Sequence, residues 1–239
     1  ITAMHVVSHD ISVGVDATFN LLQGDLLLTT NQTETFSSTN ILTVNKEDVF
    51  VFRPDTENDY SSGSFYQLLT GLATDGEQLN AISLVEQNVV VGGETVNAGT
   101  IIFAQQNGGR SDNNIYHADI NQAGATSDYN VTRFIVGNDI NIAGAISGLE
   151  LIENNINIGG ADLSAGNILV SVDSTGVIGD NSLSVTASDV SILEVTSISR
   201  FDLLGLPLVT AEAEASQFFE GSDIDFTGAS FNISAIALG

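Results

Sequence analysis

Short runs of apolar residues, separated by turn-forming residues, cover most of the chain. Continuous runs at 26–28, 49–52 and 89–91 are rich in residues that favour β-strands. Other stretches alternate between apolar and polar residues with a period of two, which is typical of half-buried strands. The pattern predicts an all-β protein with essentially no helix. The best helical candidate is one or two turns within 210–219.

Turn signals lie between the apolar runs. Glycine, asparagine and aspartate cluster at 62–63, 107–109 and 179–181. These positions divide the apolar runs into short strands, and we expect four to six strands in each repeat of the chain.

The apolar pattern also repeats along the chain. The segment 80–93 recurs at 147–160, which is 67 positions later, and an earlier copy begins at residue 2. The closing segment, 233–238, has the motif with which the chain begins. The sequence therefore predicts three repeats. Their expected bounds are 1–78, 79–145 and 146–239, the last ending in the starting motif of a further repeat.

Three repeats of short antiparallel strands fit more than one architecture. Each repeat resembles a propeller blade in length, and a β-prism or a stack of sandwiches fits equally well. In every version the end repeats expose strand edges, and an uncovered edge is a template for a further strand.

The composition narrows the class of protein. A net charge of −25, from 30 acidic and 5 basic residues, argues against nucleic acid and anionic membrane surfaces as partners. No run of about 18 apolar residues occurs, so we expect no membrane span, and residues 1–5 do not read as a signal peptide. The absence of cysteine excludes disulfides, thiol catalysis and thiolate zinc sites.

Several segments resemble the tandem repeats of very large secreted bacterial surface proteins of the adhesin type. They are the apolar strands and turn glycines at 24–30, 48–52, 68–72 and 80–84. The resemblance implies an extracellular, cell-surface protein with an adhesive or matrix-forming role, and it brings no catalytic residues. The scarcity of lysine and the acidic composition fit the same class.

The three histidines align with residues of other types in the neighbouring repeats, so the repeat gives them no shared functional role. His5 aligns with Ser83, Glu150 and Ala237, which predicts a solvent-facing side chain, and His9 is expected to be similar. His117 aligns with Ser184. We therefore expect surface histidines without a metal or catalytic role.

Carboxylates do not form an obvious catalytic pair. Glu86 and Glu153 occupy equivalent places in successive repeats, where the first repeat has Ser8. Carboxylates at equivalent places on neighbouring repeats are not expected to converge on one substrate bond. We therefore interpret both glutamates as part of a solvated face. No nucleophile elbow, phosphate loop or dinucleotide motif is present, and we predict that the chain is not an enzyme.

The sequence establishes no cofactor, and calcium is the ligand that its carboxylates favour. Asp55, Glu57 and Asp59 offer oxygens at alternate positions, but without the glycine of an EF-hand loop. A purely structural turn is the alternative.

The preferred hypothesis is an extracellular structural protein that associates head-to-tail with copies of itself through β-strand edges, giving a filament or matrix. The matching first and last segments suggest the joining surfaces, which are predicted to include Thr2, Met4, Val6, Ile233, Ile236 and Leu238.

The alternative hypothesis is a binding or adhesion module. It would recognise a glycan or a surface partner, with or without calcium, through the loops at 53–63 and 105–114. These loops differ most between repeats, and loops on a rigid scaffold commonly carry binding.

Overall fold

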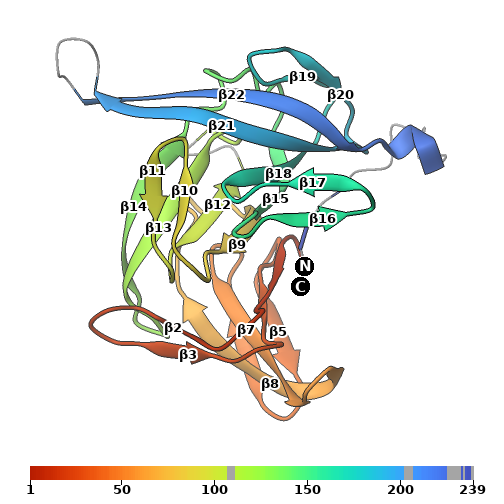
Figure 1. Ribbon diagram of the computed structural model, residues 1–239. Coiled ribbons are helices and arrows are strands. Elements are labelled where there is room, and N and C mark those ends of the chain that lie inside the picture. Colours follow the sequence, from red (N-terminus) through yellow and green to blue (C-terminus); the bar gives the residue numbers. More distant parts are fainter. Residues whose placement is uncertain (107–110, 202–206, 225–232, 234, 238–239) are drawn as a thin grey trace.

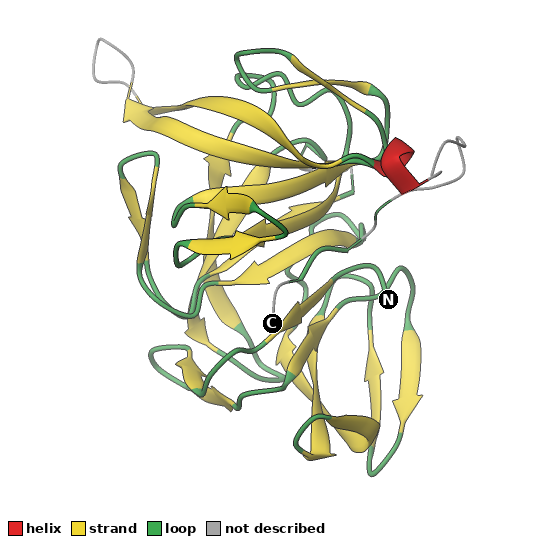
Figure 2. Cartoon of the chain, turned by 45° about the vertical axis from the view of Figure 1, so that its right-hand side comes forward, coloured by secondary structure: helices red, strands yellow, loops and turns green. Residues whose placement is uncertain are grey.

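The computed structural model describes residues 1–106, 111–201, 207–224, 233 and 235–237. The predicted all-β class is confirmed. Within these ranges the only helical element is the single 3-10 turn η1 (Gly221–Ile224), as Figure 2 shows. No helix of the described part is long and apolar enough to cross a membrane.

Three four-stranded antiparallel sheets form the body of the molecule (Figure 1). In each sheet the strands lie side by side in chain order. The first sheet contains β1 (Met4–Val6), β4 (Leu26–Leu28), β7 (Val49–Thr56) and β8 (Asp59–Leu69). The second contains β9 (Leu79–Leu84), β12 (Ile101–Gln105), β13 (Ile115–Gln122) and β14 (Asp128–Ile135). The third contains β15 (Ile146–Leu151), β18 (Asn167–Val172), β21 (Val190–Phe201) and β22 (Pro207–Phe219).

Small two-stranded hairpins connect the strands of the sheets. One hairpin follows the first strand of every sheet: β2 (Ile11–Val13) with β3 (Phe19–Leu21), β10 (Val89–Val91) with β11 (Glu94–Val96), and β16 (Ile156–Ile158) with β17 (Ala161–Leu163). A second hairpin follows the second strand of the first and third sheets: β5 (Glu34–Ser37) with β6 (Ile41–Val44), and β19 (Gly176–Ile178) with β20 (Leu183–Val185). Of the turn signals, 107–109 lies outside the described residues.

The helical candidate at 210–219 is wrong, because these residues belong to β22. Ala211, Ala213 and Ala215 are buried, whereas Glu212 and Glu214 between them are exposed. This is the period of a strand with one buried face. The high helix propensity of alanine and glutamate is overridden by pairing with β21.

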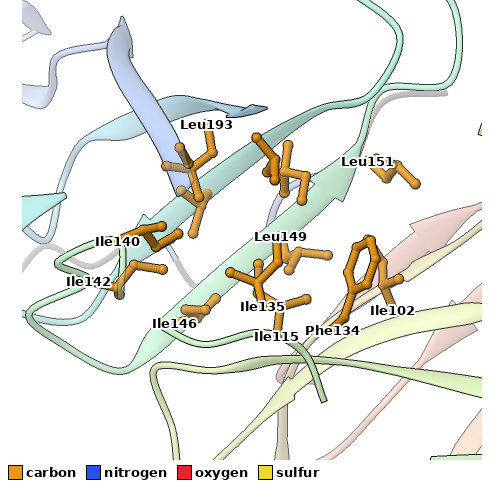
Figure 3. Packing of buried hydrophobic residues seen from close by; sticks show 14 of the residues in the cluster. Ile102, Ile115, Phe134, Ile135, Ile140, Ile142, Ile146, Leu149, Leu151 and Leu193 are labelled. Atoms are coloured by element: carbon orange, nitrogen blue, oxygen red, sulfur yellow. The ribbon is translucent and has the colours of Figure 1, made fainter. Parts of the chain in front are cut away.

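The three sheets are stacked face to face. One hydrophobic cluster joins the first sheet to the second, with Leu27 and Val51 facing Ile101 and Phe103. Another joins the second sheet to the third (Figure 3). The second sheet is therefore buried on both faces.

The packing distinguishes among the predicted architectures. Each sheet is a four-stranded meander like a propeller blade, but none of the hydrophobic clusters of the described residues combines the first sheet with the third. The described part is thus an open stack with two outer faces, fanned about the first strands of the sheets, since His5 on β1 also lies 3.4 Å from Glu150 on β15.

The same backbone contact opens each successive unit of the stack. The first residue of the incoming segment, which is the first residue of β9 and of β15 in the first two cases, donates its N–H to a carbonyl oxygen at the equivalent turn of the preceding unit. The three contacts are Leu79 N to Lys46 O (3.4 Å), Ile146 N to Asp112 O (3.0 Å) and Ile233 N to Ala187 O (3.1 Å). The segment that begins at Ile233 is therefore attached to the third sheet as the second and third sheets are attached to their predecessors.

Candidate functional site

The first strands of the three sheets bring together polar side chains from three distant segments. His5 lies on β1, Ser83 on β9 and Glu150 on β15, and the exposed fractions of the three residues are 3%, 0% and 4%. The Ser83 hydroxyl accepts the backbone N–H of Leu151 at 3.2 Å. The positions that the sequence aligns are thus neighbours in space at the centre of the molecule.

His5 is held between two buried carboxylates. Its Nδ1 lies 3.4 Å from Glu150 Oε2, and its Nε2 lies 3.2 Å from Glu86 Oε1. Burial alone would lower the pKa of His5, but the charges and hydrogen bonds of Glu150 and Glu86 raise it to about 9. His5 is therefore an imidazolium at neutral pH and donates to both carboxylates. The prediction of a solvent-facing His5 is wrong.

Glu86 binds the end of the first strand of the preceding repeat. Its carboxylate accepts the backbone N–H groups of Ser8 at 2.8 Å and His9 at 3.1 Å, and it also accepts the Ser8 hydroxyl at 2.9 Å. Burial raises the pKa of Glu86, yet the bonds from His5 and Ser8 outweigh burial and leave the pKa lowered.

Glu153 repeats this arrangement one unit later. Its carboxylate accepts the N–H groups of Glu86 at 2.6 Å and Gln87 at 2.8 Å. Burial raises the pKa of Glu153. The expectation that Glu86 and Glu153 lie apart on a solvated face is wrong, because each carboxylate reaches across to the backbone of the neighbouring repeat.

A cavity of about 300 Å³ lies beside these groups. It is lined by residues of all three repeats, among them His5, His9, Gln87, Glu150, Glu153 and Asn154. Within the described part of the chain, every fully buried side-chain nitrogen or oxygen has a hydrogen-bond partner. Over the same residues, no group of three or more histidines and carboxylates is arranged to hold a metal ion.

The predicted joining residues are engaged within the chain. Thr2 bonds through its hydroxyl to that of Thr29 at 2.8 Å, and Met4 packs against the hydrophobic cluster on the outer side of the first sheet. Val6 pairs with Leu26. Ile233 and Ile236 pack against the third sheet. Leu238 lies outside the described residues.

The outermost strands of the first and third sheets have side chains bound along their free edges. Asn40 donates to Phe65 O at 2.8 Å and accepts Phe65 N at 2.7 Å. Asn181 forms the same two-bond contact with Ala215, at 2.7 Å and 3.0 Å. Each asparagine comes from the second hairpin of its sheet and occupies the place of an added strand, which protects the edge.

The predicted calcium residues lie at the exposed end of the β7–β8 hairpin. Asp55 accepts the Thr39 hydroxyl at 2.9 Å. The hydroxyl and backbone N–H of Ser61 lower the pKa of Asp59. Asp59 therefore stabilises its own turn, and Asp55 joins this hairpin to the β5–β6 hairpin. Calcium binding at this segment stays a prediction.

Two arginines and His117 also have described contacts. Arg53 binds Asp25 with its shortest contact at 2.6 Å, and Arg200 binds Glu94 on the second repeat at 2.6 Å. His9 is exposed, as predicted. His117 is partly buried, with its ring 5.6 Å from that of Phe134.

His117 also corrects the sequence alignment. His117 pairs with Ile102, and Ile192 pairs with Leu169. Ile102 and Leu169 are equivalent in the 67-residue repeat, so the structural equivalent of His117 is Ile192. Ser184 lies instead on β20, in the additional hairpin of the third repeat. That hairpin shifts the register of the two repeats.

Comparison of the chain with protein-family models, with curated proteins and with solved structures finds no match to any of them. The functional argument therefore depends on the geometry and composition of this chain.

Proposed function

We propose that this chain is an extracellular structural protein whose β repeats stack sheet on sheet into a scaffold. One observation carries the proposal: the junction contact that opens the second and third sheets occurs a third time at Ile233. Such a recurrence is the property of a repeat array, in which each unit packs its face against the next in the same way. The acidic, cysteine-free composition supports an extracellular setting.

The scaffold extends through sheet faces and not through strand edges. The edges of β8 and β22 carry Asn40 and Asn181 in the place of an added strand. Both end segments of the chain are also used internally. Head-to-tail association of copies through strand edges consequently has less support from the geometry than stacking of sheets, and it stays a prediction.

The alternative of a glycan-binding module has weaker support. Arg53, at the start of one predicted binding loop, is bound to Asp25 and lies over the rings of Phe19 and Tyr66. Of the other predicted loop, 107–110 lies outside the described residues. Glycan recognition is therefore the function that would replace the scaffold proposal if that proposal failed.

Two measurements on the full chain test the proposal. Chemical unfolding followed by amide hydrogen exchange should show one cooperative unit, because the second sheet is buried on both faces. A glycan array, with and without calcium, should retain no sugar. Independent unfolding of the sheets, or a retained glycan whose binding is lost in the Arg53→Ala variant, would contradict the scaffold.

A further inference from the structure

The outer face of the third sheet matches a surface that the next sheet covers in each earlier repeat. Matching turns fix the correspondence, since one carboxylate or amide oxygen accepts a glycine N–H in every repeat. These contacts are Asp48 with Gly71 (2.9 Å), Asn114 with Gly137 (2.9 Å) and Asp189 with Gly221 (3.0 Å). The surface of one repeat can therefore be compared position by position with that of another.

We define the third-sheet outer face by Leu169, Val190, Ile192, Phe218 and Phe219, which belong to one hydrophobic cluster. The equivalent residues of the first sheet are Leu27, Val49, Val51, Leu68 and Leu69, and all five have an exposed fraction of 0% beneath the second sheet. Phe134, the second-sheet equivalent of Phe218, is 1% exposed beneath the third sheet. Phe218 and Phe219 are only partly buried.

Described residues of the closing segment already lie on this face. Ile233 and Ile236 pack there, and their equivalents Leu79 and Ile82 pack on the first sheet. The Ser171 hydroxyl donates to Ile233 O at 3.0 Å, as the Thr29 hydroxyl donates to Leu79 O at 3.5 Å.

The backbone at the end of β15 offers a matching polar contact. In the two earlier repeats, the N–H groups that follow the first strand bind the carboxylate of the next repeat, from Glu86 and then from Glu153. Glu153 N and Asn154 N are the third such pair, and both residues line the 300 Å³ cavity. No hydrogen bond of these two N–H groups occurs among the described residues.

A second copy of the chain cannot supply this contact with its first repeat. The outer side of the first sheet is covered by the β5–β6 hairpin, with Phe36 stacked on Phe50 at 4.9 Å. At the position of Glu86 and Glu153 the first repeat has Ser8, which has no carboxylate. The occupant must therefore have the properties of the second or third repeat.

We propose that the third-sheet outer face is a docking surface for a further repeat of the same type, set in phase with Ile233, whose carboxylate binds Glu153 N and Asn154 N. This inference depends on the proposed scaffold function and names the partner of its open end. In the phase set by Leu79 and Ile233, the carboxylate of Glu86 corresponds to the seventh residue after Ile233, the position directly after Gly239.

The test is an extended chain in which a copy of residues 86–145 follows Gly239, so that the copied Glu86 has the expected phase. We expect amide exchange at Glu153 and Asn154 to become slower by about tenfold or more, because charge-assisted hydrogen bonds contribute about 1.5–3 kcal/mol. The extended chain should remain a monomer in sedimentation experiments, and its thermal midpoint should rise.

Two matched variants separate the contacts. Glu86→Gln in the appended copy alone should keep the added sheet folded but remove most of the new protection at Glu153 and Asn154. Phe103→Asp in the appended copy alone should abolish docking, since Phe103 is 0% exposed where the second sheet meets the first.

Two outcomes would overturn the inference. In the first, both amides exchange equally fast with and without the extension. In the second, the unextended chain sediments as a dimer with both amides protected, which would make a second copy the occupant. Neither outcome affects the glycan array or the cooperativity of the three sheets, so a failure here differs from a failure of the scaffold proposal.

Discussion

The two ends of the stack face solvent in different ways. At the first sheet, the outer face is covered by the β5–β6 hairpin, and Phe50 beneath it is 0% exposed. At the third sheet, the corresponding hairpin β19–β20 packs at the side that faces the second sheet, because Ile178 and Val185 belong to the cluster shared by those two sheets. The third-sheet outer face is met instead by Ile233 and Ile236.

This difference gives the stack a direction. Repeat proteins require end units whose outer surface is closed, because an interior repeat exposes an apolar face when its neighbour is missing. The first sheet has such a closing element, whereas the third-sheet outer face keeps the character of an interior interface. The β5–β6 and β19–β20 hairpins lie on equivalent sides of their sheets, so the two ends differ because opposite faces of the unit are outermost at the two ends.

The largest expected effect comes from opening the covered end. Phe50→Ala removes a fully buried ring from the cluster under the β5–β6 hairpin, and we expect a loss of about 3–5 kcal/mol in the free energy of unfolding. Phe218→Ala at the other end should cost clearly less, because that ring is only partly buried. Urea denaturation of both variants measures the difference. Equal losses would contradict the contrast between the two ends.

The centre of the stack provides the next test. His5→Ala leaves Glu86 and Glu150 buried without their shared cation, and removal of one partner of a buried ion pair costs about 3–5 kcal/mol. We expect all three sheets to lose stability together, since the cluster includes one residue from each repeat. His9→Ala is the comparison variant: its exposed ring also lies 3.0 Å from Glu86 Oε2, and it should cost less than about 1 kcal/mol because exposed ion pairs contribute little.

The same cluster predicts a loss of stability in alkali. The folded-state pKa of His5, about 9, is above the ordinary value of 6.5. Its stabilising effect is therefore complete below pH 6.5 and is lost as the pH rises through 9, by at most about 3 kcal/mol. Unfolding free energies between pH 6 and 10 measure this loss, and the His5→Ala profile should be flatter over that range. Parallel profiles would show that His5 is not the titrating group.

The smallest effects concern the strand edges, where the two ends are alike. Asn40→Ala and Asn181→Ala each remove two hydrogen bonds to the outermost strand of a sheet. We expect losses of about 0.5–1.5 kcal/mol in each variant, together with increased aggregation measured by light scattering. If only one variant aggregates, the edges are also unequal.

The sequence predicts much of the fold and little of the central cluster. Apolar runs such as 89–91 and the 67-residue offset identify strands and repeats, because these depend on local pattern. Alanine and glutamate at 211–215 are ambiguous, since only pairing with β21 determines their conformation.

The sequence does not predict the burial of His5 and Glu86, because that burial depends on contacts between repeats. His5 Nε2 meets a carboxylate 81 residues away, and neither residue carries a local signal of burial. One signal was available: His5, Ser83 and Glu150 occupy one aligned position, which in a stack of sheets brings the three together. The asparagines on the strand edges had no comparable signal.

Amide hydrogen exchange of the unmodified chain at three equivalent positions tests the central claim most directly. The account predicts slow exchange at the Ser8–His9 and Glu86–Gln87 pairs, where a carboxylate of the next repeat is bound, and fast exchange at Glu153 and Asn154. Equal protection of all three pairs in a monomeric chain would contradict the claim that the stack has one closed end and one open end.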